Sequence, residues 1–333
     1  MNTNLQTASA SALAVALLLW VRSMKLPTFC AVVGLPALLY GLLAERTFRF
    51  GSLKGKNVLI TGASSGLGKA IALEAAKRGA AKVILLARGE DKLRQVAKMI
   101  EKHTSCKAVV VVVDVADEIA LRKALSNLSD EVDLLVNNAG AGAWKHTEET
   151  SPMEAVEMMA VPYQAAFAIT SMLLPRLSAR KGHVLNVTSS ASLAGFRGAV
   201  GYATARWAMR GFSRNLLFDV KELGVGVTLL NAGEIQGTEY FADKAGKAGA
   251  ASKDKIPMLF KLIDRLGVNY NTEQAAAAGL NAVEAGWATV LTPGIVLVPA
   301  KMMVDVMPCL MEALCELGPA GLRSRSAGPK KAD

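Results

Sequence analysis

Cysteine and histidine are scarce, and the spacing of the few that occur excludes the sites that these residues usually build. Four cysteines show no Cys-x-x-Cys pair and no short-spaced framework, so structural disulfides are not indicated. Three isolated histidines offer no metal-ligand spacing, so we expect no metal site and interpret them as surface residues or hydrogen-bonded core residues. These residues are Cys30, Cys106, Cys309, Cys315, His103, His146 and His183.

Charged and aromatic residues are also few, at 20% and 5% of the chain, against 52% hydrophobic residues. The mean hydropathy of +0.30 is high for a soluble protein and favours contact with a membrane. The net charge of +10 favours anionic partners, such as a phosphate-bearing cofactor or membrane lipid with an anionic surface. Because the basic residues are scattered and few aromatics lie among them, nucleic acid is not an expected partner.

Acidic residues are absent before Glu45, in a region that holds two apolar runs. Residues 8–21 cover about one-half to two-thirds of a bilayer span. Residues 26–44 form an uncharged run of 19 residues, which is long enough to span. Three interpretations fit: a membrane anchor of one span or a short hairpin, a cleaved targeting peptide, and an apolar helix packed on the globular domain. We favour the anchor, because the second run exceeds the roughly 7–15-residue apolar core of a signal peptide.

Basic residues after the second run set the expected orientation. Arg46, Arg49, Lys54 and Lys56 favour a cytosolic position for the domain that follows, although positive charge between the two runs weakens this inference. We expect the protein in the endoplasmic reticulum or another intracellular membrane, with its catalytic domain in the cytosol.

From Lys56 onward, short apolar runs alternate with segments of helical periodicity. Continuous apolar strands that alternate with helices indicate a parallel sheet covered on both faces, and a βαβαβ order repeated twice is doubly wound. The expected strands are residues 57–61, 82–87, 108–113, 132–137, 183–188 and 225–230, the last of which closes the series. The expected fold class is α/β: a Rossmann-like, doubly wound parallel sheet with helices on both faces, preceded by the apolar membrane segment.

The chain divides into three parts. Residues 1–50 are the membrane anchor or targeting segment, and residues 51–298 are the Rossmann-type domain, in which residues 243–255 have the composition of a mobile surface loop. Residues 299–333 are an apolar, Met-rich C-terminal helix, docked on the core or on a lipid surface, with a basic tail. Length alone does not decide between one domain and two, and the sequence leaves the oligomeric state open, a homodimer included.

The sequence TGASSGLG (residues 61–68) directly follows the first expected strand and opens a helix. Gly62 permits the tight turn, while Gly66 and Gly68 let backbone amides approach a pyrophosphate at the helix N-terminus. A turn that merely needs glycine is the alternative. The residues expected to bind a dinucleotide here are Thr61, Gly62, Ser64, Ser65, Gly66, Leu67 and Gly68.

The end of the second strand indicates which dinucleotide is bound. A carboxylate there would hold the ribose 2′-hydroxyl of NAD, but the position is Ala87, and Arg88 follows it. The guanidinium fork of Arg88 can hold a 2′-phosphate, so NADP(H) is favoured, with a solvated surface arginine as the alternative. Asp114, after the third strand, could receive the adenine amino group.

Together with two further motifs, this loop makes the chain resemble the short-chain dehydrogenase/reductase family. The motifs are Thr61–Gly68, the sequence NNAG at Asn137–Gly140, and Ser189 placed thirteen residues before Tyr202, within about residues 56–237. Membrane-anchored members of this family often act on lipophilic alcohols or ketones such as steroids, retinoids and sphingoid bases. The resemblance implies a dehydrogenase that transfers hydride between a nicotinamide and such a substrate.

The resemblance also implies roles for individual residues. Ser189 orients the substrate oxygen, Tyr202 is the general acid–base, and Arg206 stands where the family has the lysine that holds the nicotinamide ribose. Tyr202 and Arg206 are therefore expected at both the catalytic and the cofactor site. The nicotinamide-side wall is expected to be formed by Asn138, Ala139 and Gly140.

The sequence departs from the family pattern at three places. Arg206 replaces the lysine, Pro162 stands where the family has an asparagine that supports a water chain, and Ala232 replaces a proline, with Thr238 one residue late. Arginine keeps the positive charge beside the phenol and can grip two vicinal hydroxyls, but it does not readily release a proton. Proline removes the asparagine side chain and frees the carbonyl of Met158, which could still hold a water. The two losses belong to one proton relay.

We therefore predict an NADP(H)-dependent oxidoreductase that acts on a lipophilic alcohol or ketone. The main alternative is a catalytically degenerate nucleotide-binding scaffold or sensor, which Pro162 and Arg206 favour and which Ser189 and Tyr202 oppose. A structural membrane protein that has lost its cofactor is the third interpretation.

Overall fold

The computed structural model describes residues 45–140, 142–195, 198–233, 235, 270–294, 297–298, 301 and 305. The predicted membrane segment up to residue 44, the predicted loop 243–255 and most of the C-terminal part lie outside the described residues.

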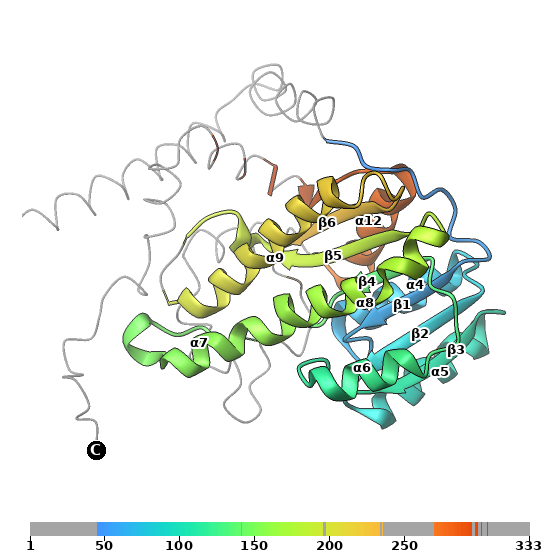
Figure 1. Ribbon diagram of the computed structural model, residues 1–333, viewed down its shortest axis with the longest axis horizontal. Helices are drawn as coiled ribbons and strands as arrows, with labels where there is room; N and C mark the ends of the chain where they lie inside the picture. The colour runs from blue at the N-terminus through green and yellow to red at the C-terminus, as the bar shows by residue number, and fades with distance from the viewer. Residues whose placement is uncertain are drawn as a thin grey trace, which may run out of the picture.

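A seven-stranded parallel sheet in the order β3-β2-β1-β4-β5-β6-β7 forms the centre of the described part (Figure 1). The chain winds from β1 outward to β3, returns to β4 beside β1, and winds outward again to β7, so the predicted doubly wound α/β fold is confirmed. The strands are β1 (Asn57–Thr61), β2 (Lys82–Ala87), β3 (Lys107–Val112), β4 (Leu134–Asn137), β5 (His183–Ser189), β6 (Gly226–Ala232) and β7 (Thr289–Thr292).

Six of these strands match the predicted runs within two residues, but the prediction that residues 225–230 close the sheet was wrong. β7 pairs in parallel with β6, from Leu229 with Thr289 to Ala232 with Thr292. It was missed because it has only four residues, two of them threonine, and is half-buried at the sheet edge, so it has no long apolar run.

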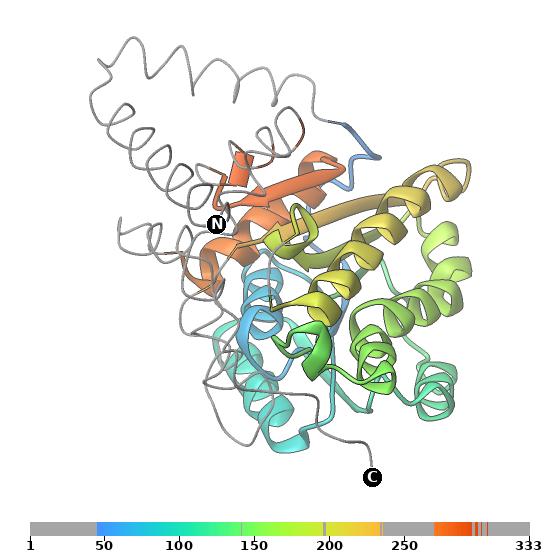
Figure 2. The ribbon, with the colours of Figure 1, turned by 90° about the vertical axis from the view of Figure 1, so that its left-hand side faces the viewer.

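Helices cover both faces of the sheet, as the alternation of strands and helices predicted. In Figure 2, α4 and α12 lie on one side of the sheet and α8 and α9 on the other. Within β1, Val58 and Ile60 point to the α4 side while Leu59 points to the opposite face. The helices are α4 (Gly66–Lys77), α5 (Glu90–His103), α6 (Glu118–Ser126), α7 (Pro152–Met159), α8 (Ala165–Ala179), α9 (Val200–Asp219) and α12 (Thr272–Ala285).

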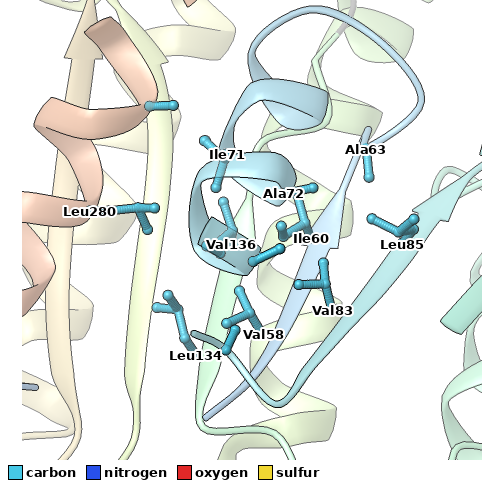
Figure 3. Packing of buried hydrophobic residues seen from close by; sticks show 14 of the residues in the cluster. Val58, Ile60, Ala63, Ile71, Ala72, Val83, Leu85, Leu134, Val136 and Leu280 are labelled. Atoms are coloured by element: carbon cyan, nitrogen blue, oxygen red, sulfur yellow. The ribbon is translucent and has the colours of Figure 1, made fainter. Parts of the chain in front are cut away.

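The core on the α4 side is built from aliphatic side chains of five strands (β1, β2, β4, β5 and β6) and three helices (α4, α5 and α12). Figure 3 shows Ile71 of α4 over Val58, Ile60 and Val136 of the sheet, with Leu280 of α12 to their left. All five side chains are fully buried. Because each such residue contributes about 1.5–3 kcal/mol when it leaves water, this layer holds α4, and with it the glycine-rich loop, rigidly on β1.

Short turns with defined caps set where several helices begin and end. The Ser151 hydroxyl accepts from the Glu154 amide and the Glu154 carboxylate accepts from the Ser151 amide, which forms a capping box at the start of α7. Asn271 and Gln274 do the same for α12, which ends at Gly286 with a left-handed φ of 74°.

A continuous helix runs over residues 152–179 through α7, the π-helical segment η3 (Ala160–Gln164) and α8. The π segment contains Pro162, whose missing N–H and ring disturb the ordinary helical ladder. By length and composition this is the one helix among the described residues that could cross a membrane. Ile169, Leu173 and Leu177 of α8 are buried in the sheet core, so packing within the fold accounts for part of its apolar character.

The residues that precede the sheet are fastened to the edge formed by α12 and β7. The Thr47 amide donates to Gly286 O at 3.0 Å, and the Ala288 amide donates to Glu45 O at 2.9 Å. The Arg46 guanidinium lies 3.3 Å above the ring centre of Trp287. The chain that follows the apolar run therefore meets the domain at the end where the strands begin.

His183 is fully buried at the start of β5, which makes it a core histidine. Thr228 Oγ1 donates to Trp287 O at 2.7 Å, so it accepts from Nε2 of His183 at 2.8 Å. Nδ1 has no hydrogen-bond partner among the described residues and lies 2.2 Å from where a Cβ on Gly226 would be. Burial lowers the pKa of His183 from 6.5 to about 3, because a second ring proton would have to enter this dry, crowded space.

This histidine predicts a loss of stability in mild acid. The contribution of the neutral His183 to the free energy of unfolding is fully present above pH 6.5 and is lost as the pH falls toward about 3. It is lost because the unfolded chain binds a proton that the folded protein does not. The free energy of unfolding should fall by up to about 1.4 kcal/mol per pH unit from this group. Urea titration between pH 7 and 4.5 should show a flatter dependence for His183→Gln, which keeps a donor toward Thr228. The His103→Gln variant, which changes an exposed histidine, should show the same pH dependence of the free energy of unfolding as the parent protein. If His183→Gln also shows the parent's pH dependence, His183 is not the cause of the loss of stability.

Candidate active site

The glycine-rich loop lies between the end of β1 and the start of α4. Gly62 and Gly66 have left-handed φ values of 66° and 53°, which favour glycine. A Cβ on Gly68 would lie 2.3 Å from Gly62 O, so this helical turn folds directly onto the strand end. Ser65 makes no side-chain cap bond at the start of α4, so first-turn amides of this helix face the loop without that cap. This geometry can accept a phosphate group.

Thr61 and Asn138 join this loop to the neighbouring strand end. Amides of Asn138 and Ala139 both donate to Thr61 Oγ1 at 3.0 Å, and Thr61 Oγ1 donates to Val136 O at 3.3 Å. The side-chain amide of Asn138 donates to Thr61 O at 3.0 Å. These bonds lie where the strand order reverses between β1 and β4, which is where open α/β sheets bind their ligands.

Arg88 and Asp114 meet at the ends of β2 and β3. The Arg88 Nη1 atom lies 3.5 Å from Asp114 Oδ2, and the two side chains are 69% and 43% exposed. An exposed pair of this kind contributes little to stability, so the guanidinium can turn toward a phosphate at low cost. The two residues expected to hold the adenine half of a dinucleotide are therefore on one side of the glycine-rich loop.

Ser189 and Tyr202 come together at the end of β5 and the first turn of α9. The Tyr202 hydroxyl donates to Ser189 Oγ at 3.2 Å, and the Ala191 amide donates to the same oxygen at 3.2 Å. Because Ser189 Oγ then accepts twice, its own proton can be donated to a substrate oxygen. A carbonyl oxygen placed between the two hydroxyls would receive two hydrogen bonds.

Arg206 lies one turn after Tyr202, on the same face of α9, as the i, i+4 spacing predicted. Its Cζ is 4.8 Å from the centre of the Tyr202 ring, and the residue is only 6% exposed. A Cβ on Gly140 would lie 2.8 and 2.9 Å from the two terminal nitrogens of Arg206. The guanidinium thus occupies the space that the missing side chain of Gly140 leaves open.

The sequence reasoning missed Gly142 and Trp144. A Cβ on Gly142 would lie 2.9 Å from Cδ2 of Tyr202, and the Trp144 indole stacks on the Tyr202 ring with centres 5.7 Å apart at 29°. The available signal was the spacing of two in Gly140, Gly142 and Trp144, which in an extended segment places all three on one side.

Two hydrogen bonds hold the Ser189 turn on α9, and neither was predicted. Thr188 Oγ1 donates to Arg206 O at 3.2 Å, and Arg210 Nη1 donates to Ser192 O at 2.7 Å. They flank Ser189 and fix its separation from Tyr202. No sequence signal marks Thr188, because threonine is ordinary in a strand.

A buried chain of polar side chains supports the site from below. Asn137 Nδ2 donates to Thr170 Oγ1 at 3.0 Å and to Asn186 Oδ1 at 2.8 Å. Asn186 Nδ2 continues to Ser213 Oγ at 2.8 Å. Because buried amides need partners, this chain fixes α8, β4, β5 and α9 relative to one another.

The other departures from the family pattern can be placed only in part. Pro162 is buried in the π segment, and the Met158 sulfur lies 2.5 Å from where a Cβ on Gly201 would be, directly before Tyr202. Ala232 ends β6, while Thr238 lies outside the described residues. No group of three His, Cys, Asp or Glu side chains that could hold a metal occurs within the part of the chain that the structure describes.

Known proteins resemble this chain in sequence and in fold. The family model for short chain dehydrogenases matches residues 56–248. The chain is 35% identical over 187 residues to the mouse protein named 3-ketodihydrosphingosine reductase, which covers 54% of this chain and 56% of the mouse protein. The chain thus spans about half the length of that curated relative. The Anopheles gambiae protein named dehydrogenase/reductase SDR family protein 7-like is 30% identical over 264 residues. That match covers 72% of this chain and 82% of the Anopheles protein.

A solved structure agrees with the fold. The alcohol dehydrogenase from Thermococcus sibiricus, complexed with 5-hydroxy-NADP, has a TM-score of 0.57 and 26% identity. The match covers 71% of this chain and 95% of that structure.

The pairing of Arg88 with Asp114 leads to a prediction about dinucleotide choice. Arg88→Ala should weaken NADPH binding by about 1–3 kcal/mol, through loss of a charge-assisted contact to the 2′-phosphate, and leave NADH binding nearly unchanged. Fluorescence titration of both dinucleotides measures this. Arg94→Ala, which removes another exposed, ion-paired arginine from the adjacent helix, is the matched control. Equal weakening of NADPH and NADH by Arg88→Ala would rule out a 2′-phosphate contact.

Proposed function

The chain belongs to the short-chain dehydrogenase family, and we propose that it is an NADP(H)-dependent oxidoreductase acting on an alcohol or ketone of a lipophilic, sphingoid-like substrate. The observation that carries this proposal is the hydrogen bond from the Tyr202 hydroxyl to Ser189 Oγ, with the buried Arg206 guanidinium beside the phenol ring.

The residues present fit a dinucleotide. Gly62 and Gly68 let the loop and the first turn of α4 pack directly on Asn138, whose side-chain nitrogen would lie 3.0 and 2.5 Å from a Cβ at these two positions. Ser65 leaves the first-turn amides of α4 without a side-chain cap, and Arg88 lies at the neighbouring strand end. In the proposed complex the loop binds the pyrophosphate and Arg88 binds the 2′-phosphate. Arg206 would hold the nicotinamide ribose, because its two terminal nitrogens can grip two vicinal hydroxyls. When bound, the nicotinamide supplies the hydride.

The hydroxyls of Ser189 and Tyr202 bind the substrate oxygen and exchange a proton with it. In the reducing direction, Ser189 Oγ donates a hydrogen bond to the ketone oxygen and Tyr202 transfers its proton to that oxygen as hydride reaches the carbon. In the oxidising direction Tyr202 accepts the proton of the alcohol. Arg206 stays charged throughout, since a guanidinium does not deprotonate in proteins. The path that resupplies protons to Tyr202 therefore does not pass through residue 206.

Apolar neighbours support a lipophilic substrate. Tyr202 is buried in a small apolar cluster with Trp144, Ala191, Ala199 and Ala203, which suits an apolar part of a substrate on that side. The name of the mouse relative identifies a ketone on a long-chain base, which supports a sphingoid-like compound over a steroid or retinoid.

The degenerate nucleotide-binding scaffold is the second candidate. Pro162 and Arg206 support it, because both remove members of the family's proton relay. The enzyme interpretation is favoured because Ser189 and Tyr202 are retained and in contact.

The catalytic proposal predicts different behaviour for three variants. Tyr202→Phe should lower kcat by about 100- to 10,000-fold with NADPH affinity nearly intact, because the phenol acts on the substrate. Arg206→Met should impair both, since it removes the ribose grip and the fixed charge. Arg206→Lys should retain NADPH binding without improving kcat, because Pro162 still interrupts the relay. Turnover of a long-chain 3-ketone is measured alongside NADPH affinity, with Tyr163→Phe as the control tyrosine. Unchanged turnover in Tyr202→Phe would remove the phenol from the mechanism.

We also propose that residues 26–44 anchor the domain in the endoplasmic reticulum or another intracellular membrane, with the catalytic domain in the cytosol. The uncharged apolar run and the basic residues that follow it support this.

Fractionation tests the anchor. The full-length protein should sediment with membranes and resist carbonate extraction, whereas a chain that begins at Glu45 should be more soluble and still bind NADPH. Beginning at Glu45 keeps the hydrogen bonds of residues 45–53 with α12 and with the turn that leads into β7. Release of the full-length protein by carbonate would contradict the anchor, and recovery of a mature protein cleaved before Glu45 would identify a targeting peptide.

A further inference from the structure

We propose that Trp144 positions the phenol of Tyr202 for proton transfer, a role that rests on the proposed function of Tyr202 as the acid–base group. Trp144 belongs to the segment after β4, which contacts α9 at every second residue. Gly140 lies against Arg206, Gly142 lies against the edge of the Tyr202 ring, and Trp144 stacks on that ring. The segment after β4 is therefore packed against the turn of α9 that carries Tyr202 and Arg206.

The orientation of a tyrosine hydroxyl depends on what surrounds its ring. The side chain has two rotatable bonds, and a swing about the first moves the hydroxyl by several ångströms. Here the Arg206 guanidinium lies 4.8 Å from the ring centre, a Cβ on Gly142 would be 2.9 Å from Cδ2, and the Trp144 indole stacks at 5.7 Å. With these three neighbours in place, the hydroxyl stays at 3.2 Å from Ser189 Oγ.

Trp144 is the only large side chain, besides Tyr202 itself, in the apolar cluster that the described residues form around the Tyr202 ring. Its other neighbours in the cluster, Ala191, Ala199 and Ala203, carry only a methyl group each. Trp144 itself is 8% exposed although it lies in a segment outside the helices and strands. If the indole is removed, the alanines cannot fill the space, so water enters beside the phenol and the ring gains freedom. Arg206 and Gly142 would still limit the ring from the other sides, so a partial loss of positioning is expected.

The effect on rate should be large compared with the effect on binding. Misplacing a reacting group by about 1 Å can cost roughly 100-fold in rate. In the proposed complex NADPH contacts the glycine-rich loop, Arg88, Asp114, residues 138–140, Tyr202 and Arg206, and Trp144 is not among these residues. Loss of the indole therefore lowers kcat and leaves the affinity for NADPH in place.

The experiment compares three variants of the full-length protein. Trp144→Ala should lower kcat about 10- to 100-fold with the Kd for NADPH changed less than about twofold. Trp144→Phe, which keeps an aromatic ring on the phenol, should recover most of the rate. Trp207→Ala removes a 45% exposed tryptophan from α9, the helix that carries Tyr202, and should leave kcat unchanged. A purely structural role for Trp144 predicts instead that the loss of kcat follows the loss of thermal stability in all variants.

A second readout does not depend on turnover. The protein has five tyrosines, so ¹³Cζ-tyrosine labelling gives few resonances, and Tyr202→Phe identifies the one from Tyr202. That resonance should shift in Trp144→Ala, because the indole ring current is lost, and stay in place in Trp207→Ala. If it shifts while the parent protein shows no turnover, the positioning stands and the proposed enzymatic function fails. If Trp144→Ala leaves both the resonance and kcat unchanged, the positioning role is overturned.

Discussion

The buried guanidinium of Arg206 is the constraint around which the site is organised. A charged group that is 6% exposed needs close, polar or polarisable surroundings, because moving a charge out of water is costly. The chain provides them with the Tyr202 ring on one side and the backbone of Gly140 on another. Gly140 is therefore a packing requirement as much as a motif residue: a Cβ there would displace the guanidinium. Through Tyr202 the same constraint extends to Gly142 and Trp144.

The rest of the fold keeps this arrangement in place. Parallel strands bring the ends of β1, β4 and β5 to one edge of the sheet, so residues more than a hundred positions apart in sequence meet there. Thr61 and Asn138 close the gap between β1 and β4, and Thr188 and Arg210 fasten the Ser189 turn to α9. The apolar layers on both faces make these strand ends rigid, which keeps the hydroxyls of Ser189 and Tyr202 at hydrogen-bonding distance.

Much of this could be predicted from the sequence, for reasons that lie in local spacing. Tyr202 and Arg206 share a helix face because they are four residues apart, and Gly62, Gly66 and Gly68 follow a strand and open a helix. The rest depended on contacts between distant segments. β7 is too short and too polar to show a strand pattern, and its pairing is decided by β6. The only sequence signal for Trp144 is its spacing of two after Gly140 and Gly142, and its contact with Tyr202 depends on how α9 packs against this segment. The bond from Thr188 to the carbonyl of Arg206 has no counterpart in residue type or spacing. The π segment at Pro162 shows the helix absorbing a proline that local propensity alone would treat as a break.

The central claim is that Tyr202 and Ser189 form a working acid–base site although arginine replaces lysine and proline replaces asparagine. Oxidation of NADPH by the purified, full-length protein in the presence of a panel of long-chain and other lipophilic ketones tests it most directly. The account predicts NADPH oxidation that depends on the ketone and saturates with a long-chain keto base. Saturable NADPH binding without oxidation across the whole panel would contradict the account and identify the protein as a nucleotide-binding scaffold.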